Sequence, residues 1–153
     1  MEMPKPTDAH RKLEKLIGYW IGEEHIHPSP SVPKGGTAIG RVHNRLAIDG
    51  FIVVQDYEQE QNGSTNLRGH GVFSWDPTQQ CYALHWFDSM GMRPSVFHGD
   101  FLENVLTLIS KEKHGLSRAL FSFLDDRTYN FRMDVSKDGS HWYPIIDGRY
   151  TRQ

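Results

Sequence analysis

The sequence predicts an all-β protein, a closed antiparallel up-and-down β-barrel of about ten strands behind one short N-terminal helix. Segments that alternate apolar and polar residues recur along most of the chain, at the 8–12-residue spacing typical of all-β sandwiches and barrels. Short turn sequences such as Asp49-Gly50 separate them, so consecutive strands can pair as antiparallel neighbours. An open meander of ten strands would leave two long unpaired edges, which closure removes. A sandwich with Greek-key crossings is the alternative, but it needs longer connections than these.

The helix is predicted over about residues 7–17 and the barrel over about residues 19–151, in a single domain 1–153. Thr7 or Asp8 can cap the helix, and Gly18 can end it. A loop rich in proline and glycine separates the first two strands. The predicted strands cover residues 19–27, 37–47, 51–60, 66–75, 81–89, 95–102, 105–111, 116–124, 129–136 and 141–151.

Composition argues against several classes of protein. The net charge is −2, so no basic face for nucleic acid is expected, and no run of like charges suggests a membrane patch. No stretch approaches the ~18 apolar residues of a spanning helix, and residues 1–15 lack an apolar signal core, so we expect a cytoplasmic protein. Cys81 is the single cysteine, which excludes an internal disulfide and a cysteine-based zinc site; we expect it to be buried.

A barrel of ten strands should enclose a cavity, because about eight strands are already enough to hold one small ligand. The strands at 66–75 and 81–89 carry apolar residues on both faces, as expected of a strand that also lines an apolar cavity, or of one that lies under the helix or a partner subunit. Outer apolar faces could also bury a homodimer interface. The candidate lumen residues are Trp20, His70, His85, Trp86, Asp88 and Arg132.

Two histidines, His70 and His85, lie mid-strand among apolar residues in neighbouring predicted strands. A buried histidine is usually held by structural hydrogen bonds; the functional alternative is an acid/base or ligand-orienting group in the cavity, together with Asp88. A catalytic triad with Ser89 lacks support, because no Gly-x-Ser-x-Gly motif is present. Catalytic residues therefore stay unassigned.

Other polar residues within strands have simpler interpretations. The mid-strand charges Asp56, Glu58, Arg132 and Asp134 belong by default on the solvated outer face, with charges paired across the cavity as the alternative. The sequence His25-x-His27 puts two imidazoles on one side of a strand, which is a usable pair of metal ligands. A third ligand would have to come from another strand, and sequence spacing cannot supply it. No metal is therefore expected.

Several motifs resemble a known family. The pattern Gly18-x-Trp20-x-Gly22-Glu23 after a short helix resembles the start of lipocalin-like, or calycin, barrels, in which the tryptophan closes one end of the lumen. More specifically, the chain resembles the bacterial family named domain of unknown function 1579. The resemblance implies a calycin-like barrel and carries no established activity. The matching stretches are 16–23, 49–58, 69–76, 85–91 and 147–150.

A more distant resemblance is to nitrobindin-like haem barrels, which share the ten-strand plan and the Gly-x-Trp-x-Gly opening. In those barrels a histidine near the C-terminus ligates iron. The nearest candidate here is His141, at a predicted hairpin loop in a different flanking pattern. The expected function is binding of a small, partly apolar molecule in the lumen. An enzyme that uses His85, His70 or Asp88, and a haem protein, are the alternatives.

Overall fold

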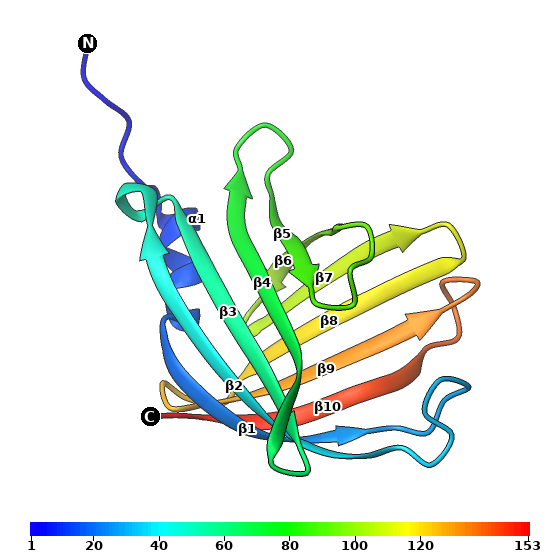
Figure 1. The fold of residues 1–153 in the computed structure, drawn as a ribbon. Coiled ribbons are helices and arrows are strands. Elements are labelled where there is room, and N and C mark those ends of the chain that lie inside the picture. Colours follow the sequence, from blue (N-terminus) through cyan, green and yellow to red (C-terminus); the bar gives the residue numbers. More distant parts are fainter.

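The structure, a computed structural model, describes residues 1–153 and confirms the closed barrel. Ten antiparallel strands follow one another around the wall, and the first strand closes the ring by pairing with the last (Figure 1). All of the predicted strands are present, with ends shifted by up to two residues. The strands are β1 (Gly18–Ile26), β2 (Gly36–Ala47), β3 (Ile52–Gln61), β4 (Ser64–Asp76), β5 (Cys81–Asp88), β6 (Ser95–Leu102), β7 (Val105–Glu112), β8 (Gly115–Phe123), β9 (Thr128–Ser136) and β10 (Tyr143–Arg152).

The N-terminal helical segment is shorter in its α-helical part than the sequence predicts. Helix α1 (Asp8–Arg11) continues directly into the 3-10 helix η1 (Lys12–Leu16). The tighter second part ends with a bond from the N–H of Ile17 to the carbonyl of Glu14, three residues back, at 3.1 Å. The helices have five residues at most, and none has the length and apolar character of a membrane-spanning segment.

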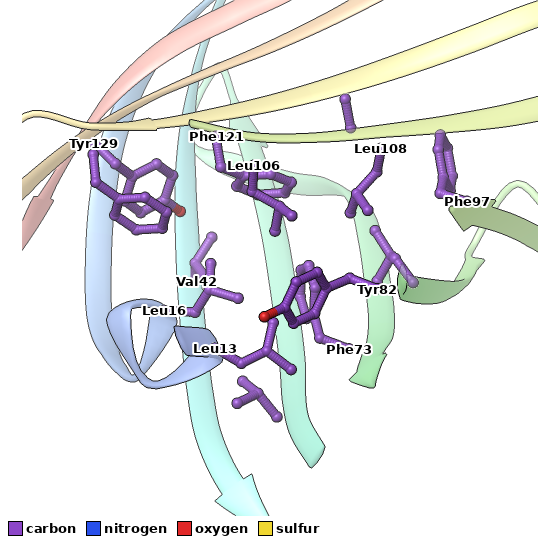
Figure 2. Packing of buried hydrophobic residues seen from close by; sticks show 14 of the residues in the cluster. Leu13, Leu16, Val42, Phe73, Tyr82, Phe97, Leu106, Leu108, Phe121 and Tyr129 are labelled. Carbon is purple, nitrogen blue, oxygen red and sulfur yellow. The ribbon is translucent and has the colours of Figure 1, made fainter. Parts of the chain in front are cut away.

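The helical segment plugs one end of the barrel. Leu13 and Leu16 are fully buried against the inner face of the sheet, next to Val42, Phe73 and Tyr82 (Figure 2). The carbonyl of Leu16 accepts hydrogen bonds from the Trp20 indole at 2.9 Å and from the Asn44 amide at 2.8 Å. The last carbonyl of the helical segment thus has hydrogen-bond partners inside the core, as a buried helix terminus requires. This end of the barrel is closed, and its side chains form the apolar core.

Three local features differ from the sequence prediction. The turn at Asp49-Gly50 is a 3-10 turn, η2 (Ile48–Gly50), rather than a two-residue hairpin loop. Strand β10 begins two residues later than predicted, because the Asp138 carboxylate accepts the N–H of His141 at 2.9 Å and holds that residue in the loop. Cys81 is half-buried rather than buried, because it is the first residue of its strand and lies at the barrel rim.

We predict that Leu16→Ala lowers the free energy of unfolding by about 2–5 kcal/mol, because it leaves a cavity in the plug that the rigid barrel wall cannot fill. Glu14→Ala, an exposed site in the same 3-10 helix, should stay within about 0.5 kcal/mol of the wild type. Urea unfolding followed by far-ultraviolet circular dichroism measures both. Equal stability of the two variants would contradict the plug.

Candidate functional site

The half of the barrel away from the helix contains a cavity of about 270 Å³. Fourteen of its 18 lining residues are hydrophobic, which gives a mostly apolar lumen with a few polar groups. Its lining includes Leu67 near the start of β4, Asp88 at the end of β5 and Ile145 near the start of β10, all at the strand ends opposite the plug. The lining residues are Glu24, Val42, Gln55, Tyr57, Gln59, Leu67, Leu84, Trp86, Asp88, Phe97, Ala119, Phe121, Tyr129, Phe131, Met133, Ile145, Ile146 and Tyr150.

Glycines at inward-facing positions shape this cavity. A Cβ atom at Gly40 would lie 2.1 Å from the hydroxyl of Tyr150 and 2.9 Å from the Glu24 carboxyl, so only glycine lets these two side chains meet. A Cβ atom at Gly69 would lie 2.2 Å from the ring of Trp86. The absence of side chains at Gly40 and Gly69 therefore leaves room for the contact between Tyr150 and Glu24 and for the Trp86 ring.

The polar centre of the lumen is the carboxylate of Glu24, which is only 3% exposed. The Tyr57 hydroxyl donates to both of its oxygens, at 2.8 and 3.0 Å, and the Gln59 amide donates to Oε1 at 3.2 Å. The Tyr150 hydroxyl donates to Oε2. No lysine, arginine or histidine forms an ion pair with Glu24. Neutral donors alone stabilise this buried acidic group.

The tyrosines around Glu24 are held in their protonated, donating form. Burial raises the pKa of Tyr57, and the nearby Glu24 carboxylate raises it further. Burial and the same carboxylate also raise the pKa of Tyr129 and of Tyr150. The rings of Tyr129 and Tyr150 stack at 5.1 Å between centroids. Tyr57 and Tyr150 are thus fixed hydroxyl donors to Glu24, and Tyr129 packs beside them in its protonated form.

Some polar groups that face the lumen keep unused hydrogen-bonding capacity. The Gln55 amide nitrogen donates to Asn44 at 2.9 Å, which leaves its carbonyl oxygen without a protein donor. The carboxylate of Asp88 accepts the indole N–H of Trp86 at 3.0 Å and the N–H of Met90 at 3.0 Å. The lining holds two carboxylates and no basic side chain. The cavity therefore offers acceptors to a bound molecule and no positive charge.

The structure divides the six lumen candidates of the sequence into three groups. Trp86 and Asp88 line the cavity. Trp20 faces inward, but it lies below the cavity floor in the plugged half, 1% exposed, with the Arg152 guanidinium 4.3 Å from its ring centroid. This is the position that the calycin resemblance implies for the tryptophan. It closes the lumen without lining it.

The lumen position predicted for His70, His85 and Arg132 is wrong. Both histidines lie on the outer face, where His85 is exposed and His70 Nδ1 lies 2.8 Å from an Asp56 carboxylate oxygen. Strand alternation explains the error: the partner face of β5 carries Leu84 and Trp86, and only one face can point inward.

Arg132 also lies outside, in an ion cluster on the outer wall. It donates to Asp134 at 2.6 Å, and Arg118 donates to the same carboxylate at 2.8 Å. Trp142 covers Arg118, with the guanidinium 4.0 Å from the ring centroid. Asp134 is consequently buried although it belongs to the outer face. These charges join β8 to β9 under Trp142 of the β9–β10 loop, and they do not line the lumen.

Two further histidine positions bear on the sequence interpretation. His25 and His27 lie on the outer face beside Asp147 of β10, which supplies the third candidate metal ligand that sequence spacing could not. His141 lies in the exposed β9–β10 loop, with Nδ1 2.7 Å from an Asp138 oxygen. No histidine lines the cavity. The residues present therefore do not fit a haem held through His141.

Sequence reasoning missed the residues at the centre of the site: Glu24, Gln55, Tyr57 and Tyr150. The usable signal was in the first strand, where Glu24 shares the face of Trp20 and Gly22. A carboxylate on the same face as a core tryptophan must be buried once that tryptophan is. The tyrosines carried no comparable signal, because aromatic residues are common on either face of a strand.

The fold and its cavity define the class: a small up-and-down β-barrel protein with an internal, mostly apolar lumen closed at one end. The chain belongs to the family of proteins of unknown function DUF1579, whose model matches residues 5–152. No curated protein matches the chain in sequence.

Solved structures share the fold at low sequence identity. Rv2717c from M. tuberculosis matches with a TM-score of 0.71 and 13% identity, over 96% of this chain and 98% of that chain. The S-type phycobiliprotein lyase CPES from Guillardia theta matches with a TM-score of 0.65 and 8% identity, over 97% and 98%. A third structure, EF1p2_mFAP2b bound to DFHBI, has a TM-score of 0.48 at 13% identity, over 95% and 100%. At these identities the likeness to the first two structures is one of fold.

We predict that Gly40→Ala lowers the free energy of unfolding by about 1–3 kcal/mol, because the added Cβ displaces the Tyr150 hydroxyl from Glu24. Gly36→Ala is the matched control in the same strand. Its Cβ would meet only the flexible Gln61 amide at 3.5 Å, and we expect a change within about 0.5 kcal/mol. Urea unfolding distinguishes them, and a Gly40→Ala variant as stable as the control would refute the close packing.

We also predict that the free energy of unfolding falls as the pH rises above about 10. The folded chain keeps the protons of Tyr57, Tyr129 and Tyr150, because their pKa values lie above the ordinary 10.0, while the unfolded chain releases them. Tyr57→Phe should make this loss shallower by up to about 1.4 kcal/mol per pH unit. Urea unfolding at pH 9, 10 and 11 measures the slope, and identical slopes would contradict the assignment.

Proposed function

We propose that this protein binds a small, flat, mostly apolar molecule in its lumen, and that the molecule is neutral or cationic and carries a hydrogen-bond donor. The observation that supports this most directly is the composition of the lining: hydrophobic walls, the two carboxylates Glu24 and Asp88, and no basic side chain. The cavity of about 270 Å³ is near the lower end of ligand pockets, which are about 300–1,000 Å³.

The charge of the lining selects against anions. A carboxylate or phosphate in the lumen would lose its hydration beside Glu24 and would find no arginine or lysine in return. A cationic or N–H-bearing group gains instead, because the Glu24 carboxylate has no ion-pair partner and a charge-assisted hydrogen bond is about twice as strong as a neutral one. The weaker bond from Gln59, at 3.2 Å, is the one that an incoming donor can replace.

The aromatic walls favour a flat molecule. Trp86 and Tyr57 lie with ring centroids 6.1 Å apart on one wall, and Phe121 and Phe131 lie 5.1 Å apart on another. The Trp86 ring is fixed by its hydrogen bond to Asp88, so it presents a constant surface at the cavity. Offset or edge-on packing against such rings adds about 0.5–1.5 kcal/mol to area burial for each aromatic pair.

Most of the residues considered for catalysis lie outside the lumen. Of the three acid/base groups considered from the sequence, His70 and His85 lie outside the lumen, and only Asp88 lines it. Binding therefore accounts for the described site better than catalysis by those histidines does.

Three fluorescent dyes that each carry an N–H donor test the proposal: cationic proflavine, neutral 7-amino-4-methylcoumarin and anionic anilinonaphthalene sulfonate. We expect saturable 1:1 binding of the cationic and neutral dyes, at least about tenfold tighter than binding of the anionic dye. Glu24→Gln should weaken the cationic dye about tenfold, because it removes the charge, and should change the neutral dye by less than about threefold. Fluorescence titration gives the dissociation constants.

The matched control is Glu23→Gln, which removes the same charge from the exposed outer face one residue away. It should leave all three affinities unchanged. Preferential binding of the anionic dye, or equal effects of the two substitutions, would overturn the proposal. Native mass spectrometry of freshly purified protein adds an independent readout through any molecule that copurifies.

A further inference from the structure

We propose that His25, His27 and Asp147 form a binding site for a divalent transition-metal ion on the outer wall of the barrel. Each of the three side chains offers one ligand atom, and these atoms all lie within 4.8 Å of one another. The site is separate from the lumen, because strand alternation places His25 on the face opposite to Glu24. The metal-site proposal therefore does not depend on the ligand proposed for the cavity.

The backbone of two hydrogen-bonded strands holds the three residues in place. In the ladder between β1 and β10, His25 lies directly opposite Asp147. His27 follows two residues later, just beyond the end of β1, and its N–H donates to the Ile145 carbonyl at 3.0 Å, which continues the pairing. Directly opposed residues have Cβ atoms about 4.5–5.5 Å apart, so the ligands converge without any loop movement.

The side chains are already close to the spacing that a metal requires. His27 Nε2 lies 2.5 Å from Asp147 Oδ2, and the rings of His25 and His27 have centroids 4.3 Å apart. In a tetrahedral site with bonds of about 2.0–2.1 Å, neighbouring ligand atoms are about 3.3 Å apart. Small side-chain rotations bring the three atoms to that distance, and the ion then replaces the proton between His27 and Asp147.

The donor set and its surroundings favour a zinc-like ion. Two imidazole nitrogens and one carboxylate oxygen suit zinc, cobalt, nickel or copper, whereas magnesium and calcium prefer all-oxygen sites. His27 and Asp147 are 24% and 43% exposed, so an ion can enter and keep water in its open positions. Arg132 pairs with Asp147 in the ladder between β9 and β10, but its guanidinium donates to Asp134 at 2.6 Å. The arginine opposite Asp147 thus donates its hydrogen bond to a different carboxylate.

The test is calorimetric titration of the tag-free protein with Zn²⁺ at pH 7.5, followed by Co²⁺ titration read by visible absorption. We expect one ion per chain, and at least about tenfold weaker binding in each of His25→Gln, His27→Gln and Asp147→Asn, since even partners outside the ligand shell change affinity by about 10–100-fold. Zn²⁺ should also raise the Tm of the wild type and not that of His27→Gln.

The matched control is His70→Gln. His70 and Asp56 form an exposed histidine–aspartate pair at 2.8 Å. His43 lies opposite Asp56 in the β2–β3 ladder, but its ring stacks on Tyr19 and does not converge with the pair into a three-ligand cluster, so loss of His70 should leave Zn²⁺ binding unchanged. His25 is exposed and makes no hydrogen bond to another side chain, so His25→Gln keeps the fold and suffices alone if another variant is unstable. Absence of saturable 1:1 binding, wild-type affinity in His25→Gln, or equal losses in His70→Gln would overturn the proposal.

Discussion

The pairing of β1 with β10 is the contact on which the rest of the structure depends. It joins residues at least 120 positions apart in the chain and turns a ten-strand sheet into a ring without free edges. Because side chains alternate across a strand, this one ladder also builds two different environments. On its inner side Tyr150 reaches Glu24, and on its outer side Asp147 reaches His25 and His27. The polar group around Glu24 and the outer group of His25, His27 and Asp147 therefore both depend on this one strand pairing.

The two ends of the barrel have different roles because only one of them is plugged. At the helix end, Leu13, Leu16 and Trp20 fill the interior, and stability comes from apolar burial. At the other end the chain leaves space: glycines stand where side chains would project inward, and the polar groups gather around Glu24. The rigid, filled half thus supports an open half in which the Tyr57 and Tyr150 hydroxyls hold the Glu24 carboxylate in place.

The sequence predicted the strands and the closed barrel, because period-two patterns and short turns are local signals. It could not decide which face of a strand points inward where both faces are apolar, and for this reason His70 and His85 were placed in the lumen. It also could not supply the register between β1 and β10, which brings Asp147 to His25. Because candidates were named on both faces of 81–89, Trp86 and Asp88 were among them, and these two share with Leu84 the face that the barrel turns inward.

Closure between the first and last strands also governs how the chain must fold. The Arg152 guanidinium donates to the carbonyl of Ile17, 135 residues earlier, and covers Trp20, so the plug is completed only after β10 has docked. Until then β1 exposes an unpaired edge, and the entropy of closing so long a loop opposes the final step. Such non-local topologies fold in milliseconds to seconds rather than microseconds. During that interval the open edge of β1 is a surface on which a second chain can add its own strand.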